Sequence, residues 1–260
     1  MANETIERTG LPDFPETKPP HAVDREVASE GCVGDVGNLK LIVYRVGFQV
    51  QRELRNDFEP WLRYYKAKVE TADWGKRVAQ FSYRLINGNF VEDYQEDLQM
   101  SEQGGQELEE IGGLLFDKRG ALQTRWLNGQ EAGTKAFGPE ISTTGVKIAV
   151  LSCTDSPKGD FLIVDQPFRH RGVASWALQT LFHMLHEEGV KFILTRPSVP
   201  LISSNLQGSS AEAQLLRRNL AFVRKAGFRR VGTSPIFGYF LQDDAHPSRS
   251  LPAEADVDPA

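Results

Sequence analysis

The sequence predicts an α/β (α+β) fold in which a parallel strand–helix–strand crossover joins a run of antiparallel strands. Two observations lead to this class. The apolar segment Phe161–Val164 is followed by a basic glycine loop, an amphipathic helix that ends at Gly189, and a second apolar segment, Val190–Thr195. Short connections of this kind predict a right-handed parallel crossover. Elsewhere, short apolar segments separated by turn residues predict antiparallel strands.

The whole-chain composition describes an ordinary globular protein and excludes several classes. The chain has 260 residues, of which 40% are hydrophobic and 25% charged, and this is enough to bury a sizeable core. Its net charge of −5 does not favour nucleic-acid binding. No signal-peptide core and no membrane-length apolar segment is evident, so we expect a cytoplasmic protein without membrane contact. Two cysteines, Cys32 and Cys153, cannot build a disulfide framework.

Both ends of the chain read as tails. Residues 1–37 contain four prolines and show no sustained periodicity, so they are predicted to be a flexible N-terminal tail. Residues 243–260 are acidic and proline-containing, and they are predicted to be a flexible C-terminal tail. One domain is expected between them, at residues 38–242.

The first half of this domain is predicted to be a strand, two helices and a loop. Leu39–Phe48 is densely apolar and predicts a strand. Two series at three- and four-residue spacing then predict two amphipathic helices. The first series is Trp61, Leu62, Tyr65 and Val69, and the second is Trp74, Val78, Phe81 and Leu85. The acidic segment Phe90–Gly105 is predicted to be mostly loop.

A hairpin and a further strand are predicted next. Glu110–Phe116 and Ala121–Leu127 flank the turn sequence Asp117-Lys118-Arg119-Gly120, so we expect two antiparallel strands. Gly112-Gly113 within the first of them indicates either a bulge or a close approach by another part of the chain. Val146–Leu151 is predicted to be another strand.

After the crossover, the sequence predicts a second helix and two closing strands. Ala211–Ala226 has an apolar stripe, and Gly227 is placed to cap its C-terminus. The cations Arg217, Arg218, Arg224 and Lys225 are expected to point outward. Phe228–Val231 and Ile236–Leu241 are predicted to be strands.

The loop before the first crossover helix carries charge at an unfavourable place. Arg169, His170 and Arg171 stand at the helix N-terminus, where unpaired amide groups and the helix dipole disfavour cations by roughly 0.3 to 1 kcal/mol each. A bound anion would reverse this cost, and Gly172 would let it approach the backbone closely. Phosphate is the obvious candidate. The alternative is that the cations simply point into water.

The hexapeptide Arg169–Ala174 fits the pattern Arg/Gln-x-x-Gly-x-Gly/Ala, and the chain resembles the GNAT superfamily of N-acetyltransferases from about Asn38 to Gln242. The resemblance implies a mixed, largely antiparallel central sheet flanked by helices, with acetyl-CoA as co-substrate. It also implies that the strand backbone and the loop hold CoA. The implied cofactor-binding residues are Ile163, Val164, Arg169, His170, Arg171, Gly172, Val173, Ala174, Ser175 and Asn219.

The catalytic residues are less clearly marked. In the family, a tyrosine four residues before the Gly-Phe pair can protonate the departing thiolate, and here Val223 stands at that place before Gly227. Tyr239 is the candidate substitute and Glu110 the candidate general base, although a packing role for Tyr239 and a solvated Glu110 are the alternatives.

The resulting hypothesis is an N-acetyltransferase that transfers acetyl from acetyl-CoA to a primary amine by direct attack. The acceptor is expected to be a small molecule or a peptide, without nucleic acid and without a metal, and a homodimer is left open. The alternatives are a catalytically silent CoA-binding or protein-interaction module on the same fold, motivated by Val223, and a domain that binds a different phosphate compound.

Overall fold

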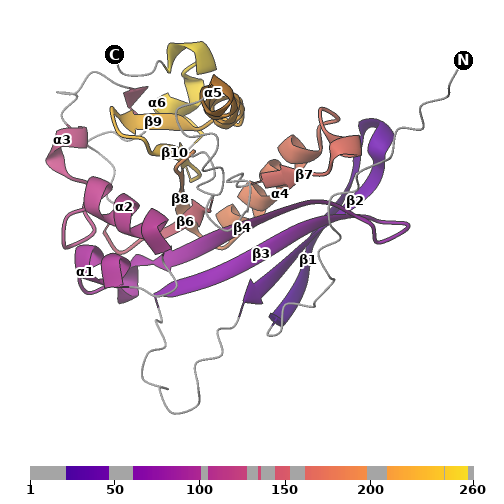
Figure 1. The fold of residues 1–260 in the computed structure, drawn as a ribbon. Helices are drawn as coiled ribbons and strands as arrows, with labels where there is room; N and C mark the ends of the chain where they lie inside the picture. Colours follow the sequence, from indigo (N-terminus) through magenta and orange to yellow (C-terminus); the bar gives the residue numbers. More distant parts are fainter. Residues whose placement is uncertain are drawn as a thin grey trace, which may run out of the picture.

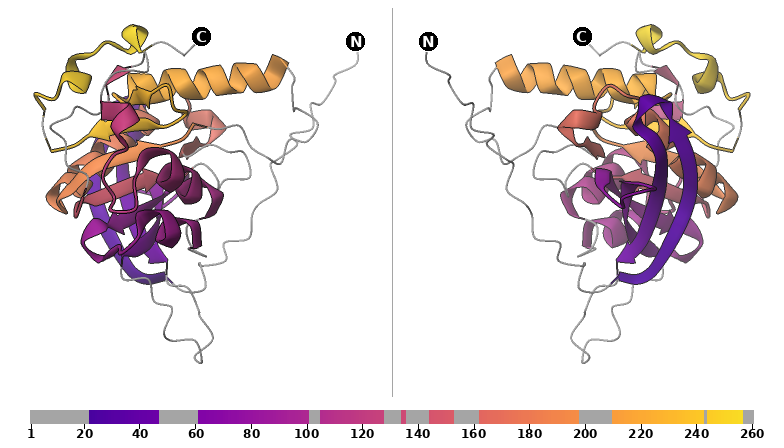
Figure 2. Two further views of the ribbon diagram at one scale, coloured as in Figure 1. Left: turned by 90° about the vertical axis from the view of Figure 1, so that its left-hand side faces the viewer. Right: turned by 90° about the vertical axis from the view of Figure 1, so that its right-hand side faces the viewer.

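The computed structural model describes residues 22–46, 61–100, 105–127, 134–135, 144–152, 162–197, 210–242 and 244–256. One sheet runs through the molecule, and helices cover both of its faces (Figure 1; Figure 2). The described strands follow the order β1-β2-β3-β4-β6-β8-β10-β9-β5, and β7 lies beside β4. The strands are β1 (Ala22–Val33), β2 (Gly37–Val46), β3 (Leu62–Thr71), β4 (Arg77–Asn87), β5 (Thr134–Lys135), β6 (Lys147–Leu151), β7 (Leu162–Val164), β8 (Val190–Thr195), β9 (Arg229–Gly232) and β10 (Phe237–Phe240).

The sheet is mixed and largely antiparallel, which confirms the predicted fold class. Among the described pairs, β6 and β8 alone run parallel. The α-helices are α1 (Tyr94–Met100), α2 (Gly105–Leu115), α3 (Thr124–Leu127), α4 (Val173–Glu187), α5 (Ser210–Lys225) and α6 (Pro247–Ser250). Short 3-10 helices occupy Gly34–Val36, Gly88–Phe90, Gln166–Phe168 and Ala253–Ala255.

The core has two halves, one on each face of the sheet. Successive side chains of a strand point to opposite faces, so in β8 Ile193 packs in one half, and Phe192 and Leu194 pack in the other. The first half is completed by α4 and by Val223 of α5, and the second by α1 and α2. The helix residues of the first half are Val173, Ala177, Leu178, Leu181, Phe182 and Leu185; those of the second are Tyr94, Leu98, Leu108, Ile111 and Leu115.

The two helices predicted in the first half of the domain are strands β3 and β4, so that prediction is wrong. A helical stripe would bury Trp74, yet this side chain is 86% exposed in the turn between the two strands. In β4 nearly every residue from Val78 to Ile86 is buried because helices cover both faces of the sheet. A segment buried on both sides has no period that separates a strand from a helix.

The hairpin predicted around Asp117 is also wrong, although its turn is present. Oδ1 of Asp117 accepts hydrogen bonds from the N–H groups of Arg119 and Ala121, each at 2.9 Å, and Gly120 has a φ of +75°. On either side of this turn, however, the chain forms α2 and the short α3, joined by one isolated bridge between Phe116 and Leu122. A local turn signal does not fix the elements that flank it.

The first glycine of the pair in α2, Gly112, lies where α2 packs closely against α1. A Cβ atom at Gly112 would lie 2.9 Å from Cδ1 of Leu98 in α1, so the glycine allows the two helices to approach closely. A close approach is therefore observed at Gly112, whereas a Cβ atom at Gly113 would meet nothing within 4 Å. The segment Phe90–Gly105, predicted to be mostly loop, contains α1 and the start of α2.

Both predicted tails contain ordered structure. In the N-terminal segment, residues 22–33 form β1, which pairs with β2 from Ala22–Val46 to Val33–Gly37; residues 1–21 lie outside the described part. In the C-terminal segment, His246, Ser248 and Asp256 are buried, and residues 257–260 lie outside the described part. Short polar segments can pack in this way when their polar groups find partners. The domain boundaries themselves stay a prediction.

From β6 onward the predicted elements are present. The strands β6 and β7 lie one after the other along the same edge of β4. Leu151 of β6 pairs with Tyr83, and Leu162 of β7 pairs with Phe81, so β7 continues β6 along β4. β6 also pairs with β8 as far as Thr195, whereas among the described residues β7 pairs with β4 alone. The sheet therefore opens beside β7, at the end of β6.

Candidate functional site

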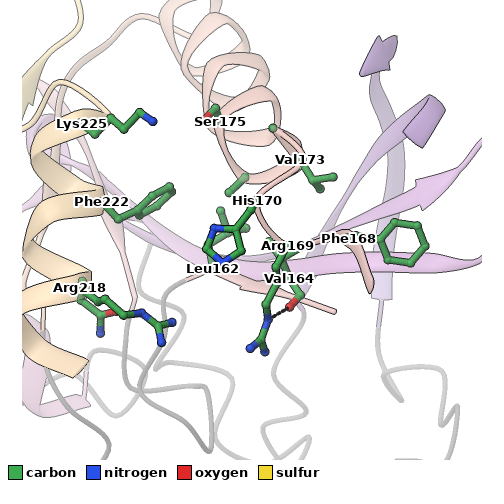
Figure 3. A pocket seen from close by; sticks show the side chains of 13 residues that line it. Leu162, Val164, Phe168, Arg169, His170, Val173, Ser175, Arg218, Phe222 and Lys225 are labelled. Atoms are coloured by element: carbon green, nitrogen blue, oxygen red, sulfur yellow. Dashed lines mark hydrogen bonds between the residues drawn. The ribbon is translucent and has the colours of Figure 1, made fainter. Parts of the chain in front are cut away.

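A pocket of about 460 Å³ lies between β7, the N-terminus of α4 and one face of α5 (Figure 3). It gathers all the predicted cofactor-binding residues except Ile163 and Arg171. Residues far apart in the sequence thus meet around one space. The lining residues are Leu162, Val164, Phe168, Arg169, His170, Gly172, Val173, Ala174, Ser175, Arg218, Asn219, Phe222 and Lys225.

The loop before α4 presents backbone amides to this pocket. Gly172, the N-cap residue, has a φ of +85° and provides no side-chain cap, and His170 also has a positive φ, +61°. The first intrahelical bond runs from the N–H of Trp176 to the carbonyl of Gly172 at 3.0 Å. The amides of residues 173–175 precede that bond and have no intrahelical acceptor. Amides in such a loop form a concave site that suits an anion.

One face of α5 supplies the opposite wall. Arg218, Phe222 and Lys225 follow one another at spacings of four and three residues, so they lie on the same side of the helix. Figure 3 shows the three side chains extending from α5 toward the loop before α4. From the sequence alone, Arg218 and Lys225 are expected to point outward into solvent. Their spacing around Phe222 is the signal that could have identified this face.

The pocket is positively charged and its cations are not neutralised by carboxylates. In the described part of the chain, no Asp or Glu forms a salt bridge with Arg169, Arg218 or Lys225. Nε of Arg169 donates to the carbonyl of Val164 at 2.9 Å, which leaves its charge uncompensated. Like charges facing one space repel each other. An anionic ligand with an apolar part would relieve this repulsion and cover the apolar surface of Phe222.

Arg171, although predicted to bind the cofactor, is engaged elsewhere. Its NH2 lies 2.6 Å from Oδ2 of Asp35, and its Nε donates to Oδ1 of the same carboxylate at 3.0 Å. This hydrogen bond from Arg171 lowers the pKa of the Asp35 carboxyl. Because Asp35 lies in the turn between β1 and β2, Arg171 ties that hairpin to the loop. It does not line the pocket.

Within the described part of the chain, β7 is paired along one backbone edge only, and its other edge lies beside the pocket. The N–H of Asp165 donates to a carbonyl of β4 at 2.9 Å. Backbone groups of alternate residues point to opposite edges of a strand, so Ile163 also faces β4, while Leu162 and Val164 face the open edge. Arg169 already occupies the carbonyl of Val164. The edge therefore presents Leu162 rather than Ile163 to a ligand.

Val223 cannot act as a proton donor, and its surroundings are those of a core residue. It is fully buried and packs in the core half formed by α4, together with Phe228. Gly227, with a φ of +97°, ends the helix as expected. The position of the family's tyrosine thus contributes packing in this chain.

Glu110, the predicted base, lies on α2 instead of on a strand, and it is near the opening in the sheet. Its Oε2 lies 2.5 Å from NH1 of Arg196, the residue that directly follows β8. This contact lies on the α2 face, opposite the face covered by α4. Arg196 neutralises the carboxylate, so Glu110 is held at the end of β8 as half of an ion pair.

Glu107 is a second carboxylate near this place, and sequence reasoning missed it. It is 2% exposed, and its Oε2 accepts a hydrogen bond from Oγ of Ser152 at 2.8 Å. Ser152 directly follows β6 and is also bonded by Arg84. Glu107 and Glu110 are one helical turn apart. That relation is visible in the sequence only if the segment is read as a helix.

Tyr239, the predicted acid, packs among aromatic rings. Its ring centroid lies 4.5 Å from that of Phe182 and 5.5 Å from that of Phe228. The pocket lining does not include it. Burial raises the pKa of its hydroxyl, and this placement favours a packing role.

The described residues show neither a metal-binding cluster nor a membrane-spanning helix. Among the residues that the structure describes, no group of three or more His, Cys, Asp and Glu side chains is arranged to hold a metal ion. Nε2 of His183 lies 3.3 Å from Oε1 of Glu187 on the exposed side of α4. None of the described helices combines the length and apolar character needed to cross a membrane.

Comparisons with known proteins identify no family. No family model matches the sequence, and no curated protein matches it. Among solved structures, the GNAT domain of PAT from S. lividans is similar over 82% of this chain and 96% of that chain, with 10% sequence identity and a TM-score of 0.30.

Proposed function

We propose that this chain is an acyl-CoA-dependent N-acyltransferase that moves an acetyl group from acetyl-CoA to a primary amine. The observation that carries the proposal is the uncompensated positive pocket at the N-terminus of α4, beside the open edge of β7. A helix N-terminus with free amides attracts phosphate groups. An open strand edge can bind an extended amide-containing arm by backbone hydrogen bonds. Acyl-CoA combines these two parts in one molecule.

The pocket suggests how the donor lies. The pyrophosphate is held by the amides of residues 173–175, with Arg169 and His170 beside it. The pantetheine arm then runs along the open edge of β7 from Val164 toward Leu162. This direction leads to the place where the sheet opens, between the end of β6 and the end of β8. The thioester would be presented there.

The chemistry at the opening is direct transfer. A neutral amine attacks the thioester carbonyl, the N–C bond forms, the C–S bond breaks, and CoA leaves as a thiolate. The attacking nitrogen loses a proton and the thiolate gains one. An N–H group on the open edge of β7 can stabilise the oxyanion. Glu110 lies on the other face of the opening and could accept this proton if the amine displaced Arg196 from its carboxylate, whereas the buried Glu107 is hydrogen-bonded to Ser152.

A catalytically silent CoA-binding module is the second candidate, and the burial of Val223 favours it. The valine side chain at that position cannot protonate the leaving thiolate. The two candidates agree on what the pocket binds and differ on turnover. The acceptor, whether a small molecule or a peptide, and a cytoplasmic location are part of the first proposal.

Substitution of Gly172 tests the binding half of the proposal. In Gly172→Val, a β-branched side chain is strained at a φ of +85°, and its Cβ would lie 3.4 Å from Cγ1 of Val33, so the loop backbone that presents the amides should be displaced. We expect CoA affinity to fall by about 100-fold or more, measured by isothermal titration calorimetry. The matched control is Gly189→Val at the other end of α4, where φ is +76° and a Cβ meets nothing within 4 Å. Unchanged CoA affinity in Gly172→Val would place the ligand elsewhere.

Thiol release tests the catalytic half. The full chain is incubated with acetyl-CoA and a panel of small amines and lysine-containing peptides, and free CoA thiol is followed with time. The enzyme predicts steady amine-dependent release that Gly172→Val abolishes and Gly189→Val retains. CoA binding without release for any amine would favour the silent module.

A further inference from the structure

We propose that α5 recognises the 3′-phosphate of the adenosine in CoA, through Arg218 and Lys225, and that Phe222 contacts the adenine. This inference rests on the proposed function, because it assigns a part of the same ligand. It adds a determinant of specificity that lies outside the loop before α4. It makes the chain selective for CoA over otherwise identical compounds that lack the third phosphate.

The positive charge of the pocket is divided between two elements. Arg169 and His170 belong to the loop, whereas Arg218 and Lys225 come from α5, some fifty residues later in the sequence. Both groups line the same pocket and approach it from different sides (Figure 3). The loop with its free amides accounts for the pyrophosphate. The α5 cations are then left without an assigned anion.

The negative charge of the donor is divided in a matching way. CoA carries a pyrophosphate and, across a ribose ring, a separate phosphate monoester on the 3′ oxygen. Two anionic groups joined by a short spacer match two cationic groups on facing elements. A phosphate monoester is a good partner for both arginine and lysine. In the described part of the chain, neither Arg218 nor Lys225 is engaged by a carboxylate that would compete.

An aromatic side chain lies between these two cations on α5. Phe222 is half-buried and lies four residues after Arg218 and three before Lys225 on the same face of α5. Its ring lines the pocket and is only partly buried, so it offers apolar surface to a flat base. Adenine attached to the same ribose would reach this surface when the 3′-phosphate lies between the two cations.

The test compares two ligands and two variants. CoA and dephospho-CoA, which lacks only the 3′-phosphate, are titrated by calorimetry into the full chain and into the double variant Arg218→Ala/Lys225→Ala. The matched control is Arg217→Ala, because Arg217 is adjacent and exposed, donates to the carbonyl of Ala213 on its own helix at 3.2 Å, and does not line the pocket. Circular dichroism establishes that the variants are folded.

We expect the wild-type chain to bind CoA about 10-fold or more tightly than dephospho-CoA. The double variant should lose that difference by weakening CoA binding alone, while Arg217→Ala keeps it. Equal wild-type affinity for the two ligands, or equal weakening of both in the double variant, would overturn the inference and leave the proposed function intact. Failure of the wild-type chain to bind either ligand would overturn both.

Discussion

Two groups of arginine and lysine side chains on or near α5 differ in whether polar groups of the chain itself bind their charged ends. At the C-terminal clamp, defined as residues 244–256 and the arginines they contact, the charges are satisfied within the chain. Arg224 is 2.9 Å from Asp256, and Arg229 donates to the carbonyl of Leu251. In the pocket, Arg218 and Lys225 have no carboxylate partner in the described structure.

The contrast is sharpest between two neighbours in the sequence. The side chain of Arg224 is 14% exposed and held by Asp256, whereas Lys225, the next residue, is exposed and lines the pocket. A charge that the fold itself pairs is a structural element, because its removal leaves a buried partner without a counterpart. A charge that the fold leaves unpaired beside a cavity is available to a ligand. The two groups should therefore respond to substitution in opposite ways.

The largest effect on stability is expected at the clamp. Asp256→Ala leaves Arg224 without its carboxylate and the N–H of Arg230 without its acceptor. We expect the free energy of unfolding to fall by about 3 kcal/mol in urea denaturation, with CoA affinity per folded molecule unchanged. Asp244→Ala is the control, because the Asp244 side chain is 90% exposed where it pairs with Arg249, and its removal should cost less than about 1 kcal/mol. Equal losses of unfolding free energy in Asp256→Ala and Asp244→Ala would contradict a structural role for the buried ion pair of the clamp.

The loop before α4 provides an internal version of the same comparison. Arg169→Ala removes a pocket cation and should weaken CoA binding by about 10-fold. Arg171→Ala removes a cation that is paired with Asp35 and should change CoA affinity by less than about threefold. Calorimetry on both variants measures this difference. If Arg171→Ala weakened CoA binding as strongly as Arg169→Ala, pairing within the chain would not separate structural from ligand-binding cations.

The smallest effect is expected at Tyr239. Tyr239→Phe keeps the ring that packs on Phe182 and removes only the hydroxyl. We expect the turnover number to change by less than about threefold, since loss of a general acid would cost about 100-fold or more. The variant should also lose less stability than the wild-type chain as the pH rises into the alkaline range. Burial raises the pKa of Tyr239, so this residue contributes stability below its usual pKa that is lost as the pH rises through the folded-state value. A 100-fold loss of turnover would restore Tyr239 as the acid.

The second half of the domain was predictable because its signals are local and consistent. The apolar segment before Arg169, the left-handed glycines at Gly189 and Gly227, and the helical stripe of α4 all point to the same elements. The first half was not predictable in this way. β4 is covered on both faces, so its apolar residues show no period of two, and chance spacings of three and four resemble a helix.

The site was predictable where it depends on one continuous segment. Except for Arg171, the predicted loop residues from Arg169 to Ser175 line the pocket, and so does Asn219, which the family resemblance pointed to. Arg218 and Lys225 were missed because a cation on a helix is usually solvated, and only the tertiary structure shows what faces it. The same holds for Arg171, whose partner Asp35 is 136 positions away in the chain. Glu107 was missed because its segment was read as the approach to a hairpin.

A crystal structure of the full chain with CoA tests the central claim most directly. We predict that the pyrophosphate lies at the amides of residues 173–175 and that the 3′-phosphate lies between Arg218 and Lys225. The pantetheine arm should follow the open edge of β7, with Arg171 still bound to Asp35. CoA bound at another surface, or this pocket left empty at saturating CoA, would contradict it.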